Sequence, residues 1–249
     1  MLKDFDRNGI FATHADHFVF SGVDAVSCGE YGLFPVRAHG GLIDGCTATG
    51  HTDSGIYVGS STDITVRNCR AWGNVVGIEV ENSTDVDVRD NLVFDNTAGI
   101  GVFLLPGLSV TTAADVRLRG NVVVGNNRPN FGDPDDEVSS VPSGVGIFVL
   151  GVDRTRIERN VVVGNDLLGI GVGSLHLLGR LEGLPPGAVD TVEPNPDGVT
   201  VRNNLVLLNG RGASNPVLPS GDLVWDGSGT DNHWRDNVFL TSIPGGLPS

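Results

Sequence analysis

The sequence predicts an all-β solenoid, in which short strands wind into coils that stack along one axis. One observation is a tandem repeat: residues 54–74 and 77–96 share a Gly-apolar-x-apolar run followed by Asp-x-x-Val-Arg. The other is composition, because 36 of the 249 residues are glycine and short Val-rich runs leave little room for helical periodicity. Since the repeat begins at residue 9 and is still legible near residue 237, we expect one domain that spans residues 1–249.

The glycine that opens the first strand of each coil sets the repeat length. Its spacing is 22 or 23 residues, apart from one interval of 47 that contains an insertion. It recurs at Gly9, Gly32, Gly55, Gly77, Gly99, Gly146 and Gly169, with a degraded copy near Asp222. A second strand of the type Asp-Val-x-Val-Arg and a third of the type Leu-Val-Phe follow it. We therefore expect about eight coils of 22 or 23 residues with three strands in each.

Two columns of polar residues mark the turns between these strands. A side-chain amide at an inward bend can bond the backbone of its own coil and of the next, and each bond contributes about 0.5–1.5 kcal/mol. The first column is an expected asparagine ladder: Val23, Cys46, Cys69, Asn91, Asn121, Asn160, Asn204 and Asn237. We expect its two cysteines to be buried free thiols, with a disulfide as the alternative because stacked coils bring them within bonding range. The second is Cys28, His51, Asn74, Asn96, Asn126, Asn165 and Asn209.

Strand alternation assigns the two faces of the first strand. The apolar positions of Gly-Ile-x-Val point inward, so the x position points outward. In chain order the x residues are Phe11, Phe34, Tyr57, Glu79, Gly101, Phe148 and Gly171. Insertions in solenoids emerge from turns, and here they either wall a groove above this face or decorate the surface. They occupy residues 104–112, 127–144, 174–197 and 210–221.

Charge and sorting signals limit the partners of the chain. Its net charge is −14 and its basic residues are scattered, so we do not expect it to bind nucleic acid. It has neither a run of about 18 apolar residues, as a transmembrane helix requires, nor a signal peptide. Met1 falls in the middle of a coil. We therefore expect a missing N-terminal segment or another subunit, as in a homo-oligomer, to cover the open N-terminal end.

The ladder, the three-strand coil and the signature Arg-Asn-Asn-x-Val resemble the right-handed parallel β-helix superfamily. More narrowly, the chain resembles the pectate-lyase-like group and its bacterial repeat relatives, the carbohydrate-binding and sugar-hydrolase domains. The resemblance covers nearly the whole chain. It implies a secreted or periplasmic protein that acts on a polysaccharide or oligosaccharide in a groove beside the first strand.

The chain departs from the active-site motifs of these relatives. The Asp-Pro-His-Asp motif of mannuronan epimerases is absent, and the similar run Asp133-Pro-Asp-Asp136 lies in an insertion. The paired aspartates of polygalacturonases and the Lys and Arg cluster of pectate lyases are also missing. The resemblance therefore predicts the fold more specifically than the activity.

Candidate catalytic residues gather on the second to fourth coils. For glycoside hydrolysis one carboxyl must be protonated while another is ionised, and Glu79 and Asp53 are the expected pair, with Glu81 two residues further along the strand. For lyase or epimerase chemistry, Tyr57 or His51 would act as base or acid, and Arg37 would neutralise the uronate carboxylate. The alternative is that Glu79 and Glu81 are ordinary solvated residues.

Two further sets complete the candidate residues. The aromatic row of Phe11, Phe34 and Tyr57 can stack on sugar rings, or it can pack against a missing segment or a partner. Tyr31 and His39 are the other expected substrate contacts. The insertion residues Asp133, Asp135 and Asp136 suit Ca²⁺, although their spacing is not that of an EF-hand and a solvated acidic loop is the alternative. The sequence leaves open a polysaccharide lyase, epimerase or hydrolase and a non-catalytic carbohydrate-binding, surface or assembly module.

Overall fold

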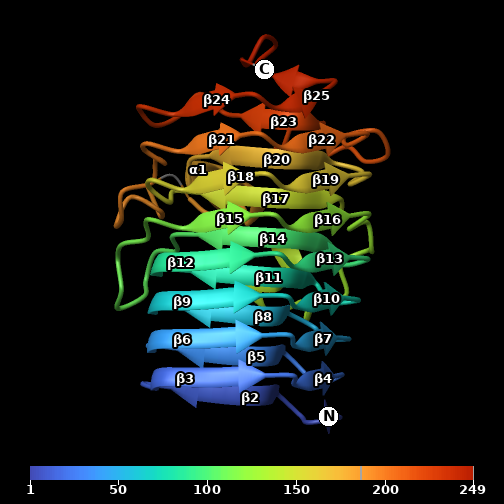
Figure 1. Ribbon diagram of the computed structural model, residues 1–249. Coiled ribbons are helices and arrows are strands. Elements are labelled where there is room, and N and C mark those ends of the chain that lie inside the picture. The colour runs from blue at the N-terminus through green and yellow to red at the C-terminus, as the bar shows by residue number, and fades with distance from the viewer. Residues whose placement is uncertain (186, 249) are drawn as a thin grey trace.

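The computed structural model describes residues 1–185 and 187–248, which wind into coils stacked along one axis (Figure 1). Three sheets run the length of the stack, and neighbouring strands in each sheet are parallel. Figure 1 shows the N-terminus at one end of the stack and the C-terminus at the other. This arrangement confirms the expected three-strand coil and the expected β-helix.

Each coil contributes one strand to each sheet in the same order. The first sheet contains β2 (Asn8–Thr13), β5 (Tyr31–Val36), β8 (Ser54–Gly59), β11 (Val76–Glu81), β14 (Ala98–Phe103), β17 (Val145–Leu150), β20 (Leu168–Gly173), β23 (Gly221–Trp225) and β26 (Ser242–Ile243). The second sheet contains β3 (Asp16–Ser21), β6 (His39–Asp44), β9 (Thr62–Arg67), β12 (Thr84–Arg89), β15 (Arg117–Arg119), β18 (Arg156–Glu158), β21 (Thr200–Arg202) and β24 (His233–Arg235). The third sheet contains β1 (Leu2–Lys3), β4 (Asp24–Val26), β7 (Thr47–Thr49), β10 (Arg70–Trp72), β13 (Leu92–Phe94), β16 (Val122–Val124), β19 (Val161–Val163), β22 (Leu205–Leu207) and β25 (Val238–Phe239).

The register of the first sheet matches the one expected from the repeat. Ile56 pairs with Ile78, which pairs with Ile100, and all three side chains are fully buried in the core. One residue further along, Tyr57 pairs with Glu79 on the opposite face of the sheet. The inward positions therefore build the core, and the x positions form an outward row.

Both asparagine ladders are present in the turns. In the first, Asn121 Oδ1 accepts hydrogen bonds from the backbone N–H and the side-chain Nδ2 of Asn91 at 3.1 and 3.0 Å. Asn121 Nδ2 in turn donates to the Val88 carbonyl at 2.9 Å and to Asn160 Oδ1 at 3.0 Å. Cys46 and Cys69 fill the same column as buried free thiols, as expected.

The second ladder ends on an acid instead of an amide. Asp222 is buried, and its Oδ1 accepts from Asn209 N and Nδ2 at 2.9 and 3.0 Å. Its Oδ2 accepts from the backbone N–H groups of Leu240 and Thr241. The degraded repeat near Asp222 is therefore a place where one side chain closes the ladder and fastens the C-terminal segment.

Two short helices lie in the insertions. The 3₁₀-helix η1 (Glu137–Ser140) belongs to the insertion at 127–144, and α1 (His176–Leu181) belongs to the one at 174–197. Leu178 and Val141, one from each insertion, pack against the hydrophobic core cluster. The two insertions are therefore held against the solenoid by apolar contacts.

Candidate active site

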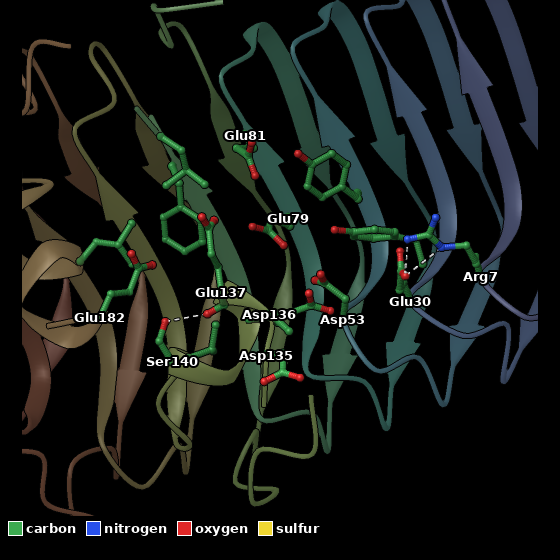
Figure 2. Close-up of a pocket in the computed structure, with 17 residues that line it drawn as sticks. Arg7, Glu30, Asp53, Glu79, Glu81, Asp135, Asp136, Glu137, Ser140 and Glu182 are labelled. Atoms are coloured by element: carbon green, nitrogen blue, oxygen red, sulfur yellow. Dashed lines mark hydrogen bonds and ion pairs between the residues drawn. The ribbon is translucent and has the colours of Figure 1, made fainter. Parts of the chain in front are cut away.

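A groove of about 470 Å³ lies over the outward face of the first sheet (Figure 2). Strands β5, β8 and β11 form its floor, and the two insertions that carry η1 and α1 form its wall. We call it the carboxyl groove, and its lining residues are Arg7, Glu30, Tyr31, Asp53, Tyr57, Glu79, Glu81, Phe103, Leu105, Asp135, Asp136, Glu137, Val138, Ser140, Val141, Leu178 and Glu182. The interpretation of the insertions as walls is therefore confirmed for 104–112, 127–144 and 174–197, whereas 210–221 contributes none of the described lining residues.

The insertions bury floor residues that strand alternation alone would leave in solvent. Tyr57, Glu79 and Glu81 are each only 8% exposed. Figure 2 shows Glu79 between Glu81 and Asp53, with Asp136 and Glu137 facing them from the wall. The interpretation of Glu79 and Glu81 as solvated surface residues is wrong, because the insertion at 127–144 folds over the strand that carries them.

Ser54, the first residue of β8, joins two of the carboxyl groups. Its Oγ lies 3.0 Å from Asp53 Oδ1 and makes a very short contact with Glu79 Oε2. A hydroxyl has one proton and can donate it to only one acceptor at a time. One of the two carboxyl groups must therefore be protonated and donate to Ser54, while Ser54 donates to the other.

Burial and mutual repulsion decide which carboxyl keeps the proton. Burial, with the charges of Asp53 and Glu81 adding to it, raises the pKa of Glu79 well above its usual value. Burial also raises the pKa of Asp53, but only to about 6, because hydrogen bonds from Tyr31 and Ser54 oppose the increase. Near neutral pH, Glu79 is therefore the protonated partner and Asp53 the ionised one.

Glu81 is the third acid of the floor. Burial raises its pKa to about 7, against the effect of the Tyr57 hydroxyl, which lowers it. Burial and the neighbouring carboxylates raise the pKa of Tyr57 as well, so its phenol stays protonated. The floor thus holds three carboxyl groups with pKa values above those of ordinary surface acids.

Positive charge is scarce in this groove. Eight carboxyl side chains line it, whereas Arg7 is the one basic residue among the described lining residues. Arg7 is paired with Glu30, with 2.9 Å between Arg7 Nη2 and Glu30 Oε1, and its side chain is mostly exposed. Mutual repulsion among the acids is therefore left largely uncompensated.

A second groove of about 370 Å³ adjoins the first toward the N-terminal coils. Tyr57 and Glu81 line both grooves, so the two meet at these side chains. Phe11, which is 54% exposed, and Phe34 lie in the second groove with ring centroids 5.1 Å apart. The aromatic row expected from the sequence is therefore present, and Tyr31 joins it with its ring 4.3 Å from that of Phe34.

Three of the predicted site residues lie elsewhere. His51 is 0% exposed inside the second ladder, where its Nδ1 accepts from the Cys28 N–H at 3.2 Å and burial lowers its pKa to about 4. It is therefore a neutral ladder residue that does not reach the groove. His39 is wrongly predicted as a groove residue, because it begins β6 in the second sheet. Arg37 lines the second groove, where its Nη2 lies 3.4 Å from Ser109 Oγ.

The expected calcium site is not supported by the geometry. Asp133 is exposed and accepts a hydrogen bond from the Asp135 N–H at 3.0 Å, whereas Asp135 and Asp136 line the carboxyl groove. Across residues 1–185 and 187–248, no group of three or more His, Cys, Asp or Glu side chains is arranged to hold a metal ion. The same described residues contain no helix that is long and apolar enough to cross a membrane.

Sequence reasoning missed several groove residues, of which Ser54 is the most informative. It stands where the neighbouring coils carry Tyr31 and Val76. The serine next to Asp53 is therefore a departure from the repeat that can be seen in the sequence. Glu30 and Arg7 carried no such signal. Phe103 and Glu182 could not be placed without the course of the chain around the insertions.

Residues 2–162 of this chain match the sequence model of a protein family described as the right-handed β-helix region. Among solved structures, the periplasmic alginate epimerase AlgG is similar at 19% identity and a TM-score of 0.63, covering 94% of this chain and 48% of that one. The A-module of the Azotobacter vinelandii mannuronan C-5 epimerase AlgE6 is similar at 14% identity and 0.66, covering 94% and 54%.

A third structure, the DFA-IIIase from Arthrobacter chlorophenolicus A6 in complex with GF2, is similar at 10% identity and a TM-score of 0.58, covering 95% and 53%. The chain thus spans about half the length of these three structures. No curated protein matches its sequence. At such identities the similarity concerns the fold alone.

Proposed function

The chain belongs to the right-handed β-helix family, and we propose that it cleaves or transfers glycosidic bonds of a polysaccharide or oligosaccharide in the carboxyl groove. Two of the similar structures are named as epimerases of alginate or mannuronan, and a third as a DFA-IIIase. These names support a carbohydrate substrate for this chain. They do not select the reaction, so the proposal rests on the residues of the groove.

The Asp53–Ser54–Glu79 array is the observation that carries the proposal. Glycosidic cleavage needs one protonated and one ionised carboxyl close together. The Glu79 proton turns from Ser54 to the leaving oxygen and is transferred to it as the C–O bond breaks. The Asp53 carboxylate either bonds to the anomeric carbon or takes a proton from the water that bonds to it. The Ser54 hydroxyl then turns to donate to the new Glu79 carboxylate, which stabilises the charge formed in the step.

The charge of the groove disfavours the lyase and epimerase alternatives. Both reactions remove the C5 proton of a uronate, and a cation must neutralise the substrate carboxylate as this happens. Arg7 is already paired with Glu30, and Arg37 lies in the second groove. A uronate would therefore bind among carboxylates that repel it, whereas glycosidic cleavage uses these same groups.

A non-catalytic module is the second candidate function. The exposed ring of Phe11 beside Phe34 offers an apolar surface that a glycan or a partner protein can cover without any reaction. A secreted or periplasmic location would suit either function and agrees with the name of the periplasmic epimerase among the similar structures.

A glycan screen tests the proposal. Neutral, acidic and aminated glycans are incubated with the wild type, and new reducing ends and the absorbance of unsaturated uronates are followed. We expect new reducing ends without unsaturated uronates, and a loss of at least about 100-fold in kcat for Glu79→Gln. Asp63→Asn, at an exposed position of β9 in the second sheet, is the matched control and should keep full activity. Unsaturated uronates among the products would contradict glycosidic cleavage. So would a glycan that the wild type and both variants bind but none of them cleaves.

A further inference from the structure

The carboxyl groove is more acidic than acid–base cleavage requires. Two carboxyl groups suffice for that chemistry, yet eight line the groove. They also come from separate parts of the chain: Asp53 and Glu79 belong to the floor, whereas Asp136, Glu137 and Glu182 belong to the wall. Asp136 raises the pKa of Asp53, and Glu137 raises that of Glu79, so wall and floor repel each other.

The floor carboxyls have few hydrogen-bond donors, which is an observation separate from the charge. Ser54 holds Glu79 Oε2, and among the described residues no second donor reaches the Glu79 carboxyl. The Glu81 carboxyl has the Tyr57 hydroxyl beside it and makes no ion pair within the described part of the chain. Both side chains are more than nine-tenths buried and point into the groove. Buried carboxyl groups with so few donors favour a ligand that brings donors and positive charge.

The walls of the groove narrow the chemistry of that ligand. The rings of Tyr31 and Tyr57 lie 5.1 Å apart, and aromatic faces attract organic cations. A metal ion is disfavoured because the described acids do not converge as a ligand set. A neutral sugar brings hydroxyl donors but leaves the repulsion in place. A protonated amine brings three N–H donors and one positive charge on a single small group.

We propose that the carboxyl groove binds an aminated glycan, with the ammonium group of one sugar seated between Glu81 and the facing wall acid Glu137, beside the protonated Glu79. The inference rests on the proposed function, because it names the substrate class of the same site. The amine relieves the repulsion between floor and wall, and the adjoining Phe34 stacks on a neighbouring sugar. Since the bound cation lowers the pKa of Glu81 from about 7, complex formation releases protons near pH 6.5 to 7.

Calorimetric titration with oligosaccharides of equal length tests the inference. The probes are a β-1,4-linked glucosamine hexamer, its fully N-acetylated form and an oligomannuronate, each in two buffers of different ionisation enthalpy at pH 6.5. We expect the glucosamine hexamer to bind at least tenfold more tightly than the N-acetylated hexamer, to release protons, and to weaken as salt rises. The oligomannuronate should bind most weakly.

Variants locate the effect. Glu81→Gln and, on the wall, Glu137→Gln keep the side-chain volume and should each reduce the preference for the amine about tenfold, whereas Asp63→Asn should leave it unchanged. Equal affinity for the amine and its N-acetylated form overturns the inference. So does equally tight binding of hexalysine, which would make the groove a general site for polycations.

The outcomes also separate the inference from the proposed function. If a neutral glycan is cleaved with dependence on Glu79 and without preference for amines, the inference fails and the proposed function stands. If the glucosamine hexamer binds with proton release but is never cleaved, the inference stands and glycosidic cleavage fails.

Discussion

The asparagine ladders and the carboxyl groove are two regions of one solenoid that both bury polar side chains, and they do so in opposite ways. In the ladders each amide meets donors and acceptors of the coils on either side, as Asn121 does with Asn91 and Asn160. In the groove the carboxyls of Glu79 and Glu81 meet other acids, and Ser54 is the one donor to Glu79 among the described residues.

The comparison shows how burial with partners differs in consequence from burial without them. A fully paired amide stabilises the fold, because the interior bonds replace those made to water. Crowded carboxyls that lack cations destabilise the folded state, and such groups tend to occur where a protein binds or reacts. Four experiments test whether the ladder is stabilising and the groove destabilising.

The largest effect is expected in the ladder. Asn121→Ala removes four buried hydrogen bonds and takes from the backbone N–H of Asn91 its acceptor, so we expect the free energy of unfolding to fall by roughly 3–5 kcal/mol. Urea unfolding followed by circular dichroism measures it. Asn237, at the end of the ladder, makes three such bonds, and Asn237→Ala should cost less. A loss below about 1 kcal/mol for Asn121→Ala would remove the contrast between the two regions.

The pH dependence of stability tests the groove. Glu81 has a pKa of about 7 in the folded protein and an ordinary one near 4.5 in the unfolded chain, so between these values the folded state holds more protons. Its contribution to stability is therefore complete below about pH 4.5 and is lost as the pH rises through about 7. By linkage the loss is about 3 kcal/mol.

Glu81→Gln should remove this part of the pH dependence. Unfolding free energies at pH 4.5 and pH 7.5 give the difference between the variant and the wild type, and Asp63→Asn should retain the wild-type slope. An identical slope in Glu81→Gln would mean that Glu81 is not held protonated by burial.

A smaller change is expected from the hydroxyl beside Glu81. The Tyr57 hydroxyl lowers the pKa of Glu81, so Tyr57→Phe should raise it. Carboxyl carbon NMR during a pH titration follows Glu81 directly. A pKa that falls or stays fixed would show that the hydroxyl does not stabilise the ionised carboxylate.

The smallest change is a gain. Cys69 occupies a ladder position, and its backbone N–H donates to Asn91 Oδ1 at 2.9 Å. Its thiol, however, is a weaker hydrogen-bond acceptor than the amide oxygen of an asparagine. Cys69→Asn extends the ladder by one amide and should raise the free energy of unfolding by about 0.5–1.5 kcal/mol. Unfolding in urea under reducing conditions measures it, and a loss of stability would show that the neighbouring Cys46 coil cannot accommodate the larger side chain.

The sequence by itself determined the solenoid, because its hydrogen bonds recur at fixed spacing and each coil templates the next. The repeat located the first strands, the columns of Asn121 and Asn96 and the outward row of Tyr57 and Glu79. The repeat also placed His51 in the second ladder, where it lies in the structure. That position is incompatible with the predicted role of His51 as a catalytic base. These features follow from contacts between adjacent coils.

Only the tertiary structure decided that the outward row is buried. The insertions at 127–144 and 174–197 have no periodicity, and their course depends on apolar contacts such as those of Val141 and Leu178 with the core cluster. That course buries Glu79 and brings the exposed Glu137 near it, and burial together with this repulsion raises the pKa of Glu79. The sequence identified Asp53 and Glu79 as a pair, whereas the bridging role of Ser54 required the actual distances between side chains far apart in the chain.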